Sequence, residues 1–170
     1  MHRKVIESKI FSPKESLVHL LNQWKFKQNK IVFTNGCFDI LHLGHVDYLT
    51  KAADMGNILI IGLNSDRSVS EIKGKNRPIN SETSRANLLA SLSFVNAVVL
   101  FDESTPYELI KFIQPDVLVK GADYKIEEVV GYDIVKANGG EITTIGFLAE
   151  YSTSAIEQRI IENHAKALEK

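Results

Sequence analysis

The chain has 170 residues, 44% of them hydrophobic, which suits one domain with a sizeable core. It carries 20 lysines and arginines against 21 acidic residues, and this balance excludes the overall basic field that holds nucleic acid. No apolar run approaches the roughly 20 residues needed to span a bilayer, and Cys37 is the only cysteine. We therefore expect a soluble cytoplasmic protein without structural disulfides.

The first predicted element is a helix within residues 12–28, with Ser12 as its cap and Pro13 at the first helical position. Five short runs rich in valine and isoleucine then predict buried strands at residues 30–34, 58–63, 97–101, 116–121 and 141–147. Amphipathic stretches predict helices at residues 46–55, 82–93, 106–114 and 127–138, and a closing helix that starts at Ser152 or Thr153.

This alternation predicts an α/β fold, a Rossmann-like parallel sheet of about five strands with helices on both faces. Residues 1–29 would form an N-terminal helical extension and residues 30–170 a single domain. In such sheets ligands bind beyond the carboxyl ends of the strands, where helix N-termini present free N–H groups. Functional residues are expected at that edge.

The stretch TNGCFDILHLGHVDYL, residues 34–49, joins the first predicted strand of the domain to the helix that follows. Gly36 would let the backbone turn sharply, and His42 and His45 fall near the first turn of the helix, on one face. Gly44 between them would let a large anion approach the main chain. A phosphate is the ligand that this arrangement favours.

Two other interpretations of the histidine pair are open. Zinc would need further ligands, but Cys37 is the only thiol and the other histidines lie in the terminal segments. The pair could also be capping or core histidines without chemistry. No GxxxxGK[ST] loop occurs, and no GxGxxG follows the first strand, so other phosphate-binding motifs are excluded.

Basic residues gather in two further places. Lys73, Lys75, Arg77 and Arg85 lie between the second strand and the next helix, where a mobile loop could close over phosphates; a solvated loop is the alternative. Lys120 ends the fourth strand in VLVKGADY and would face the binding edge unless it is a solvated strand end. By the same argument, Asp123 and Tyr124 would line the nucleotide side.

The histidine stretch resembles the HxGH signature of the nucleotidyltransferase superfamily, whose members join an NTP to a phosphorylated small molecule and release pyrophosphate. YSTSAI, residues 151–156, is similar to its second signature, an ISTT-like segment that opens the last helix. The likeness is greatest to adenylyltransferases of D-glycero-β-D-manno-heptose 1-phosphate, the second domain of bifunctional ADP-heptose synthases. It extends over KGKNRPIN, FDESTP and DVLVKGADY, while Ala122 and Glu150 depart from the expected KGGDY and EGYST.

The resemblance implies an enzyme that transfers AMP from ATP to a sugar 1-phosphate and releases pyrophosphate. The implied catalytic residues are His42, His45, Lys73 and Lys120. The implied nucleotide-binding residues are Thr34, Asn35, Gly36, Phe38, Gly44, Asp66, Arg85, Asp123, Tyr124, Tyr151, Ser152 and Thr153, and the implied sugar-phosphate-binding residues are Asp39, Lys75 and Arg77. Asp39 and Asp66 could instead be turn carboxylates, and Ser152 and Thr153 an ordinary N-cap.

The chemistry fits these residue types. A sugar 1-phosphate is mostly dianionic near neutral pH, with a second pKa around 6, so its oxygen can attack the α-phosphorus of ATP without a general base. The reaction needs charge compensation, which histidine and lysine donors would give together with Mg²⁺. We expect ATP phosphates, rather than a protein metal site, to hold the Mg²⁺.

Two alternatives remain for the function. A glycerol-3-phosphate cytidylyltransferase-like enzyme shares both signatures but differs in base and acceptor, and a catalytically silent nucleotide-binding module would lack turnover. The segment before the first strand is too short for a kinase domain, so a separate sugar kinase is expected to supply the acceptor. A homodimer is compatible with the sequence.

Overall fold

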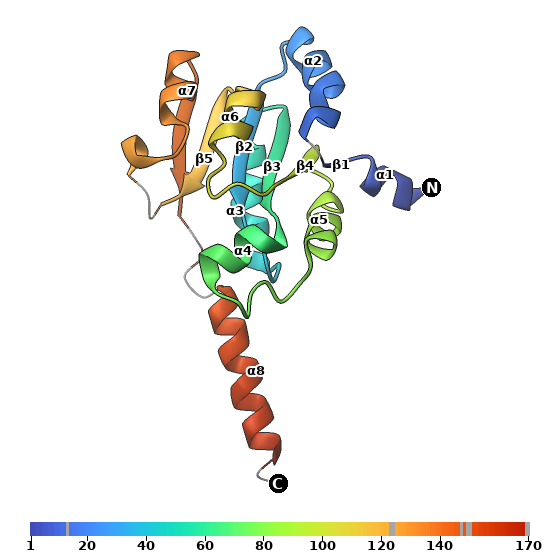
Figure 1. Cartoon of the computed structure of the whole chain (residues 1–170), viewed down its shortest axis with the longest axis vertical. Coiled ribbons are helices and arrows are strands. Elements are labelled where there is room, and N and C mark those ends of the chain that lie inside the picture. Colours follow the sequence, from blue (N-terminus) through green and yellow to red (C-terminus); the bar gives the residue numbers. More distant parts are fainter. Residues whose placement is uncertain (13, 123–124, 147, 149–150, 169–170) are drawn as a thin grey trace.

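The computed structural model describes residues 1–12, 14–122, 125–146, 148 and 151–168 (Figure 1). Within these residues six parallel strands form one sheet in the order β1-β4-β3-β2-β5-β6. They are β1 (Ile10–Phe11), β2 (Ile31–Gly36), β3 (Ile58–Asn64), β4 (Ala97–Phe101), β5 (Val117–Gly121) and β6 (Glu141–Ile145). Counted from β2, the longer strands follow the Rossmann order, so the predicted fold class is confirmed.

The helices of the described chain connect these strands. They are α1 (His2–Glu7), α2 (Val18–Phe26), α3 (Leu43–Ala53), α4 (Asp66–Lys73), α5 (Glu82–Ala90), α6 (Tyr107–Ile113), α7 (Tyr132–Ala137) and α8 (Thr153–Leu168). Short 3₁₀ turns, η1 (Lys14–Leu17) and η2 (Ile126–Glu128), precede α2 and α7. The predicted helices are found, although the helix expected in residues 12–28 is divided between η1 and α2, and the one expected in residues 127–138 between η2 and α7. The sequence did not predict α1, β1 or α4.

Both faces of the sheet are covered, and this explains why the strands read as continuous apolar runs. Every residue of β3 is buried. Leu21 of α2, Ile110 of α6 and Val135 of α7 pack on one face. Leu49 of α3 and Leu89 of α5 pack on the other. None of the described helices is long and apolar enough to cross a membrane.

The N-terminal segment contributes to the same core as the rest of the chain. β1 pairs with β4 at the edge of the sheet, where Phe11 is buried, and Leu17 and Leu21 pack below it. Residues 1–29 therefore add a sixth strand as well as helices to the sheet, and their division from the rest of the chain stays a prediction.

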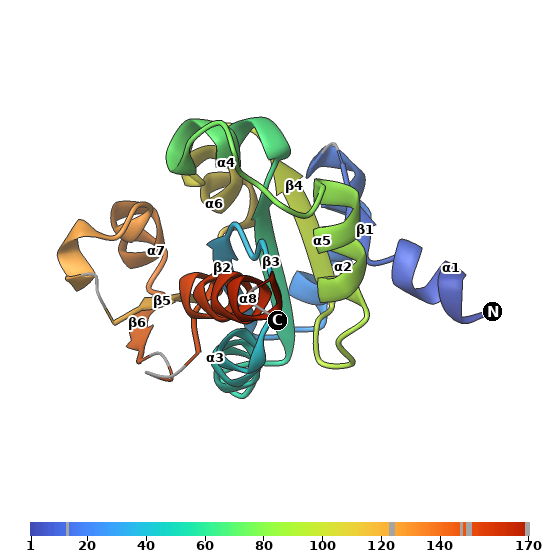
Figure 2. The same cartoon turned by 90° about the horizontal axis from the view of Figure 1, so that it is seen from below.

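The closing helix α8 begins at the carboxyl end of the sheet and points away from the body of the domain (Figure 1). Viewed along α8, its first turns lie over the strand ends, next to α3 (Figure 2). α4 also lies at this end of the sheet. The edge at which ligands were expected is thus surrounded by α3, α4 and α8.

Candidate active site

The sheet reverses its strand order at β2, because the chain proceeds to β3 on one side and returns to β5 on the other. A cavity of about 270 Å³ opens at the carboxyl ends of β2 and β5. The turn after β2 lines it, together with His45, Lys73, Lys120 and Thr153. Four segments that are far apart in the sequence therefore meet at the switch point, where ligands of open α/β sheets bind.

The two histidines lie at the start of α3, as the sequence predicted. His42 is the N-cap residue, and its carbonyl accepts hydrogen bonds from the backbone N–H groups of His45 (2.9 Å) and Val46 (3.2 Å). The imidazole rings stack with centroids 3.8 Å apart, and Phe38 meets the His45 ring edge-on at 5.2 Å. This packing fixes both rings beside the cavity.

Each histidine keeps one ring nitrogen without a partner. The Nδ1 atoms of His42 and His45 are both buried and form no hydrogen bond within the protein. A buried polar atom without a partner costs free energy, so such atoms are rare unless a ligand uses them. The pair therefore brings unsatisfied hydrogen-bonding capacity to the cavity that His45 lines.

The histidines are held in the neutral form when the site is empty. Burial, together with the nearby positive charge of His42 and Lys73, lowers the pKa of His45 to about 4, against the opposite effect of the Ile40 backbone carbonyl. Burial also lowers the pKa of His42. An anion in the cavity would reverse this balance, because negative charge favours the protonated imidazole.

The glycines of this stretch have roles that differ from the expected ones. The sharp turn predicted at Gly36 falls at Phe38, whose φ is +45°. Gly44 is buried, and a Cβ there would lie 3.1 Å from both the His42 ring and the Cβ of Tyr151. Gly44 therefore allows the His42 side chain and the segment before α8 to approach the helix closely.

The segment that opens α8 supplies a second side of the cavity. Thr153 lines it, whereas the Ser152 hydroxyl accepts a hydrogen bond from the backbone N–H of Ala155 at 3.1 Å. The alternative of an ordinary cap thus holds for Ser152. Tyr151 is 41% exposed and contributes its backbone and Cβ to the contact with Gly44.

Two lysines face the site. The ammonium group of Lys120, at the end of β5, donates a hydrogen bond of 2.5 Å to Oδ1 of Asn35, at the end of β2. Lys73 is the last residue of α4 and lines the same cavity. The basic segment that was expected to be a mobile loop therefore begins with a helix, and this helix positions Lys73 at the carboxyl ends of the strands.

A second cavity of about 380 Å³ adjoins the first and shares Asn35, Gly36, Cys37, Lys73 and Lys120 with it. Its further lining combines polar side chains with apolar ones: Asn64, Ile72, Ser104, Thr105, Pro106 and Val130. None of these six residues was predicted from the sequence to belong to the site. The polar residues that follow the apolar runs of β3 and β4 were the available signal.

Three residues predicted to bind substrates are engaged within the protein. Arg85 is 1% exposed and donates to the carbonyls of Asn80 (3.0 Å) and Cys37 (2.6 Å) and to Oδ1 of Asp66 (2.8 Å). Asp66 is therefore the partner of Arg85. Thr34 is fully buried and its hydroxyl lies 2.8 Å from that of Tyr48. These contacts support the strand end and the turn, and the predicted ligand roles of the three residues stay predictions.

Asp39 and Arg77, predicted to bind the sugar phosphate, also form contacts within the protein. The Asp39 carboxylate is 3% exposed and accepts hydrogen bonds from the backbone N–H groups of Ile79 and Asn80 and from Arg77. These donors hold the pKa of Asp39 below its ordinary value, although burial acts in the opposite sense. Asp39 thus fixes the segment between α4 and α5 against the turn after β2.

Lys75 is exposed on that segment and lines neither cavity. Cys37 lines both, and burial raises the pKa of its thiol, so it stays protonated near neutral pH, in agreement with a residue that serves the turn. Asp123 and Tyr124 lie outside the described residues, as does Glu150, so their predicted roles stay predictions.

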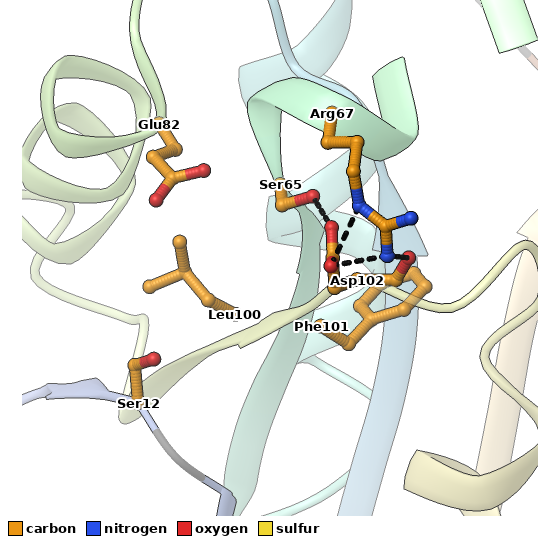
Figure 3. A pocket seen from close by; sticks show the side chains of 7 residues that line it. All are labelled: Ser12, Ser65, Arg67, Glu82, Leu100, Phe101 and Asp102. Carbon is orange, nitrogen blue, oxygen red and sulfur yellow. Dashed lines mark hydrogen bonds and ion pairs between the residues drawn. The ribbon is translucent and has the colours of Figure 1, made fainter. Parts of the chain in front are cut away.

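A separate open hollow lies at the ends of β3 and β4 (Figure 3). Its charged groups are already paired, since Asp102 accepts hydrogen bonds from Ser65 and from the Arg67 guanidinium, with Nε at 2.9 Å. Glu82 accepts a hydrogen bond from the backbone N–H of Asp66 at 2.8 Å. The residues that line this hollow include none of the histidines and lysines found at the switch point. We therefore take the cavity at the switch point as the candidate active site.

The same residues also bear on whether the protein itself could hold a metal ion. Among the residues that the structure describes, no group of three or more His, Cys, Asp or Glu side chains could hold one. The donors around the cavity are cations and neutral rings, which suit an anion and repel a free cation.

A parallel Rossmann-like sheet with two stacked histidines and two lysines at its switch point is typical of nucleotide-binding α/β proteins. The chain belongs to the cytidylyltransferase-like family, which matches residues 33–159. The prediction of a nucleotidyltransferase is thereby confirmed.

The chain is 54% identical over 159 residues to the bifunctional protein HldE of Wolinella succinogenes, covering 94% of this chain and 32% of that protein. It is 55% identical over 158 residues to HldE of Helicobacter hepaticus, covering 93% and 31%. The chain therefore spans about a third of the length of these relatives.

Solved structures agree with this family. The chain is similar to a lipopolysaccharide core biosynthesis protein of Thermoplasma volcanium, with a TM-score of 0.56 and 27% identity, covering 71% of this chain and 97% of that one. Pantoate-beta-alanine ligase of Francisella tularensis shares the fold, with a TM-score of 0.62 and 17% identity over 87% of this chain and 75% of that one.

Proposed function

We propose that the chain transfers AMP from ATP to D-glycero-β-D-manno-heptose 1-phosphate, giving ADP-heptose and pyrophosphate. The observation that carries the proposal is the stacked His42–His45 pair, whose buried Nδ1 atoms lack partners beside Lys73 and Lys120. The similarity to HldE proteins supports the choice of acceptor. Since ATP and sugar phosphates are cytoplasmic metabolites, the reaction would take place in the cytoplasm.

In this reaction a phosphate oxygen of the acceptor bonds to the α-phosphorus of ATP while the bond from that phosphorus to the bridging oxygen breaks. The acceptor is a dianion with a second pKa around 6, so no side chain has to remove a proton. Pyrophosphate leaves with added negative charge. His42 and His45 would donate to the triphosphate oxygens, and contacts that strengthen as charge develops lower the barrier.

The two adjoining cavities suggest how the substrates share the site. The triphosphate would lie in the cavity that has His45 and Thr153, next to the start of α8. The acceptor would lie in the second cavity, where Ser104 and Thr105 offer hydroxyl groups to a polyol. Lys73 and Lys120 line both cavities, so they would stand where the two phosphates react.

Mg²⁺ would enter with ATP, bound by its phosphates. When bound, it would supply part of the charge neutralisation that triphosphate chemistry requires. The protein donors would hold the remaining phosphate oxygens. A sugar kinase activity outside these 170 residues would form the acceptor.

Pyrophosphate release tests the proposal, with ATP or CTP combined with heptose 1-phosphate or glycerol 3-phosphate. We expect release with ATP and heptose 1-phosphate. Pyrophosphate release only from the pair of CTP and glycerol 3-phosphate would favour the cytidylyltransferase alternative. Nucleotide binding without release from any pair would identify a silent module, and either outcome would refute the proposal.

A further inference from the structure

Arg77 connects three segments that border the candidate site. It lies in the segment between α4 and α5, and its side chain is 20% exposed. One guanidinium nitrogen, Nη1, donates to Oδ2 of Asp39 at 2.9 Å, and Nη2 forms an ion pair with Glu157 of α8. The planar fork of arginine is suited to joining two fixed carboxylates in this way.

The two segments that Arg77 contacts, the turn after β2 and α8, both contribute residues to the triphosphate cavity. Asp39 belongs to the turn after β2, which also carries Phe38, the residue that packs on His45. Glu157 lies one helical turn after Thr153, on the same face of α8. Arg77 therefore connects the histidine side of the cavity to its α8 side.

The attachment of α8 gives this connection its importance. α8 points away from the body of the domain, and Ile160 and Ile161 further along it are 60% and 62% exposed (Figure 1). Among the described residues, the Arg77–Glu157 pair is the ion pair that links α8 to the body. Glu157 lies one turn after Thr153, so this ion pair acts on the first turn of α8.

We propose that Arg77 is a positioning residue that holds the first turn of α8 against the turn after β2, so that Thr153 and the histidines face one triphosphate. The inference rests on the proposed function. Misplacement of a binding group by about 1 Å can lower a rate by about 10²-fold, so a link of this kind affects turnover without touching substrate. Both terminal nitrogens of the Arg77 guanidinium pair with carboxylates of the protein, and this distinguishes Arg77 from a direct phosphate ligand.

Glu157→Gln separates these two roles by the direction of its effect. If Arg77 positions α8, loss of the Glu157 charge loosens the first turn, and we expect the KM for ATP to rise about tenfold. If Arg77 binds a phosphate directly, the substitution releases Arg77 from a competing carboxylate, and the KM should fall. An unchanged or lower KM would overturn the proposal.

Glu162→Gln is the matched control, because Glu162 is also on α8 and accepts a hydrogen bond from Gln158 of the same helix at 2.9 Å. It should leave KM and kcat unchanged. Arg77→Lys keeps the charge but reaches one carboxylate at a time, so it should restore only part of what Arg77→Ala loses. The effect of Arg77→Ala should not increase when Glu157→Gln is added, since each substitution by itself already breaks the Arg77–Glu157 ion pair.

Direct binding of a non-hydrolysable ATP analogue, together with a thermal melt, keeps the test informative for slow variants. A wild-type chain that releases no pyrophosphate would refute the proposed function. A wild-type chain that turns over normally, with Glu157→Gln equal to Glu162→Gln, would refute the positioning role alone. An Arg77→Ala variant that melts like wild type yet binds the analogue normally would have the same consequence.

Discussion

His45→Ala tests the candidate site most directly. The substitution removes a ring whose buried Nδ1 has no protein partner and which stacks on His42 at 3.8 Å. If that nitrogen serves the triphosphate in the transition state, its loss resembles the loss of one oxyanion donor. We therefore expect kcat to fall by about 10²-fold or more, equivalent to roughly 3 kcal/mol.

The effect on folding should be much smaller. His45 is half-buried and packs against Phe38 and His42, so truncation should cost about 1–2 kcal/mol. A domain with a stability of at least about 5 kcal/mol would then remain folded in more than about 99% of its molecules. Unfolding therefore cannot account for a loss of 10²-fold.

The assay is pyrophosphate release at saturating ATP, Mg²⁺ and heptose 1-phosphate, with a thermal melt of the same sample. His164→Ala is the matched control, because His164 is exposed on α8. His45→Gln keeps a side-chain donor and should recover part of the rate. A folded His45→Ala variant with kcat within about threefold of wild type would refute the reasoning and return His45 to a packing role.

Three further predictions follow from the same contacts. Lys73→Ala should lower kcat/KM for ATP about tenfold, since a charged donor is lost, whereas Lys75→Ala should match wild type in the same assay. Arg85→Met should lower stability by about 3 kcal/mol and Tm by about 6–12 °C, because Asp66 and two carbonyls lose a buried partner; an unchanged melt would contradict this. Because the pKa of His45 is depressed in the folded state, the unfolded chain binds more protons than the folded chain between about pH 6.5 and 4. Lowering the pH through this range should therefore lower Tm, and should lower it less in His45→Ala.

The strands could be predicted because their environment leaves a simple pattern. A parallel sheet covered on both faces buries every residue of β3, so the strand reads as an unbroken apolar run. β1 has two residues, which is too short for any such pattern. α4 buries only Ser68 and Val69, and its polar composition reads as a loop. Its best signal was the Ser65 cap, which accepts a hydrogen bond from the backbone N–H of Ser68 at 3.1 Å.

The position of the histidine pair could also be predicted from its place in the sequence. The pair follows a strand and opens a helix, and helix N-termini at strand ends attract anions. The roles of the charged residues could not be predicted in the same way. Asp39 meets Arg77, and Arg85 meets Asp66, across gaps in the sequence that only the folded chain closes. Until those partners are known, a structural carboxylate and a ligand carboxylate look alike.

The structure divides the basic residues of the site according to their chemistry. Arg77 and Arg85, with rigid planar donors, join carboxylates and carbonyls of the protein itself. Lys73 and Lys120, with a compact charge on a flexible stem, line the space where phosphates would gain and lose bonds. A flexible ammonium group can follow a departing pyrophosphate, whereas an arginine fixed by two partners cannot. The arginines therefore maintain the shape of the site, and the lysines are left to respond to the charge that develops in it.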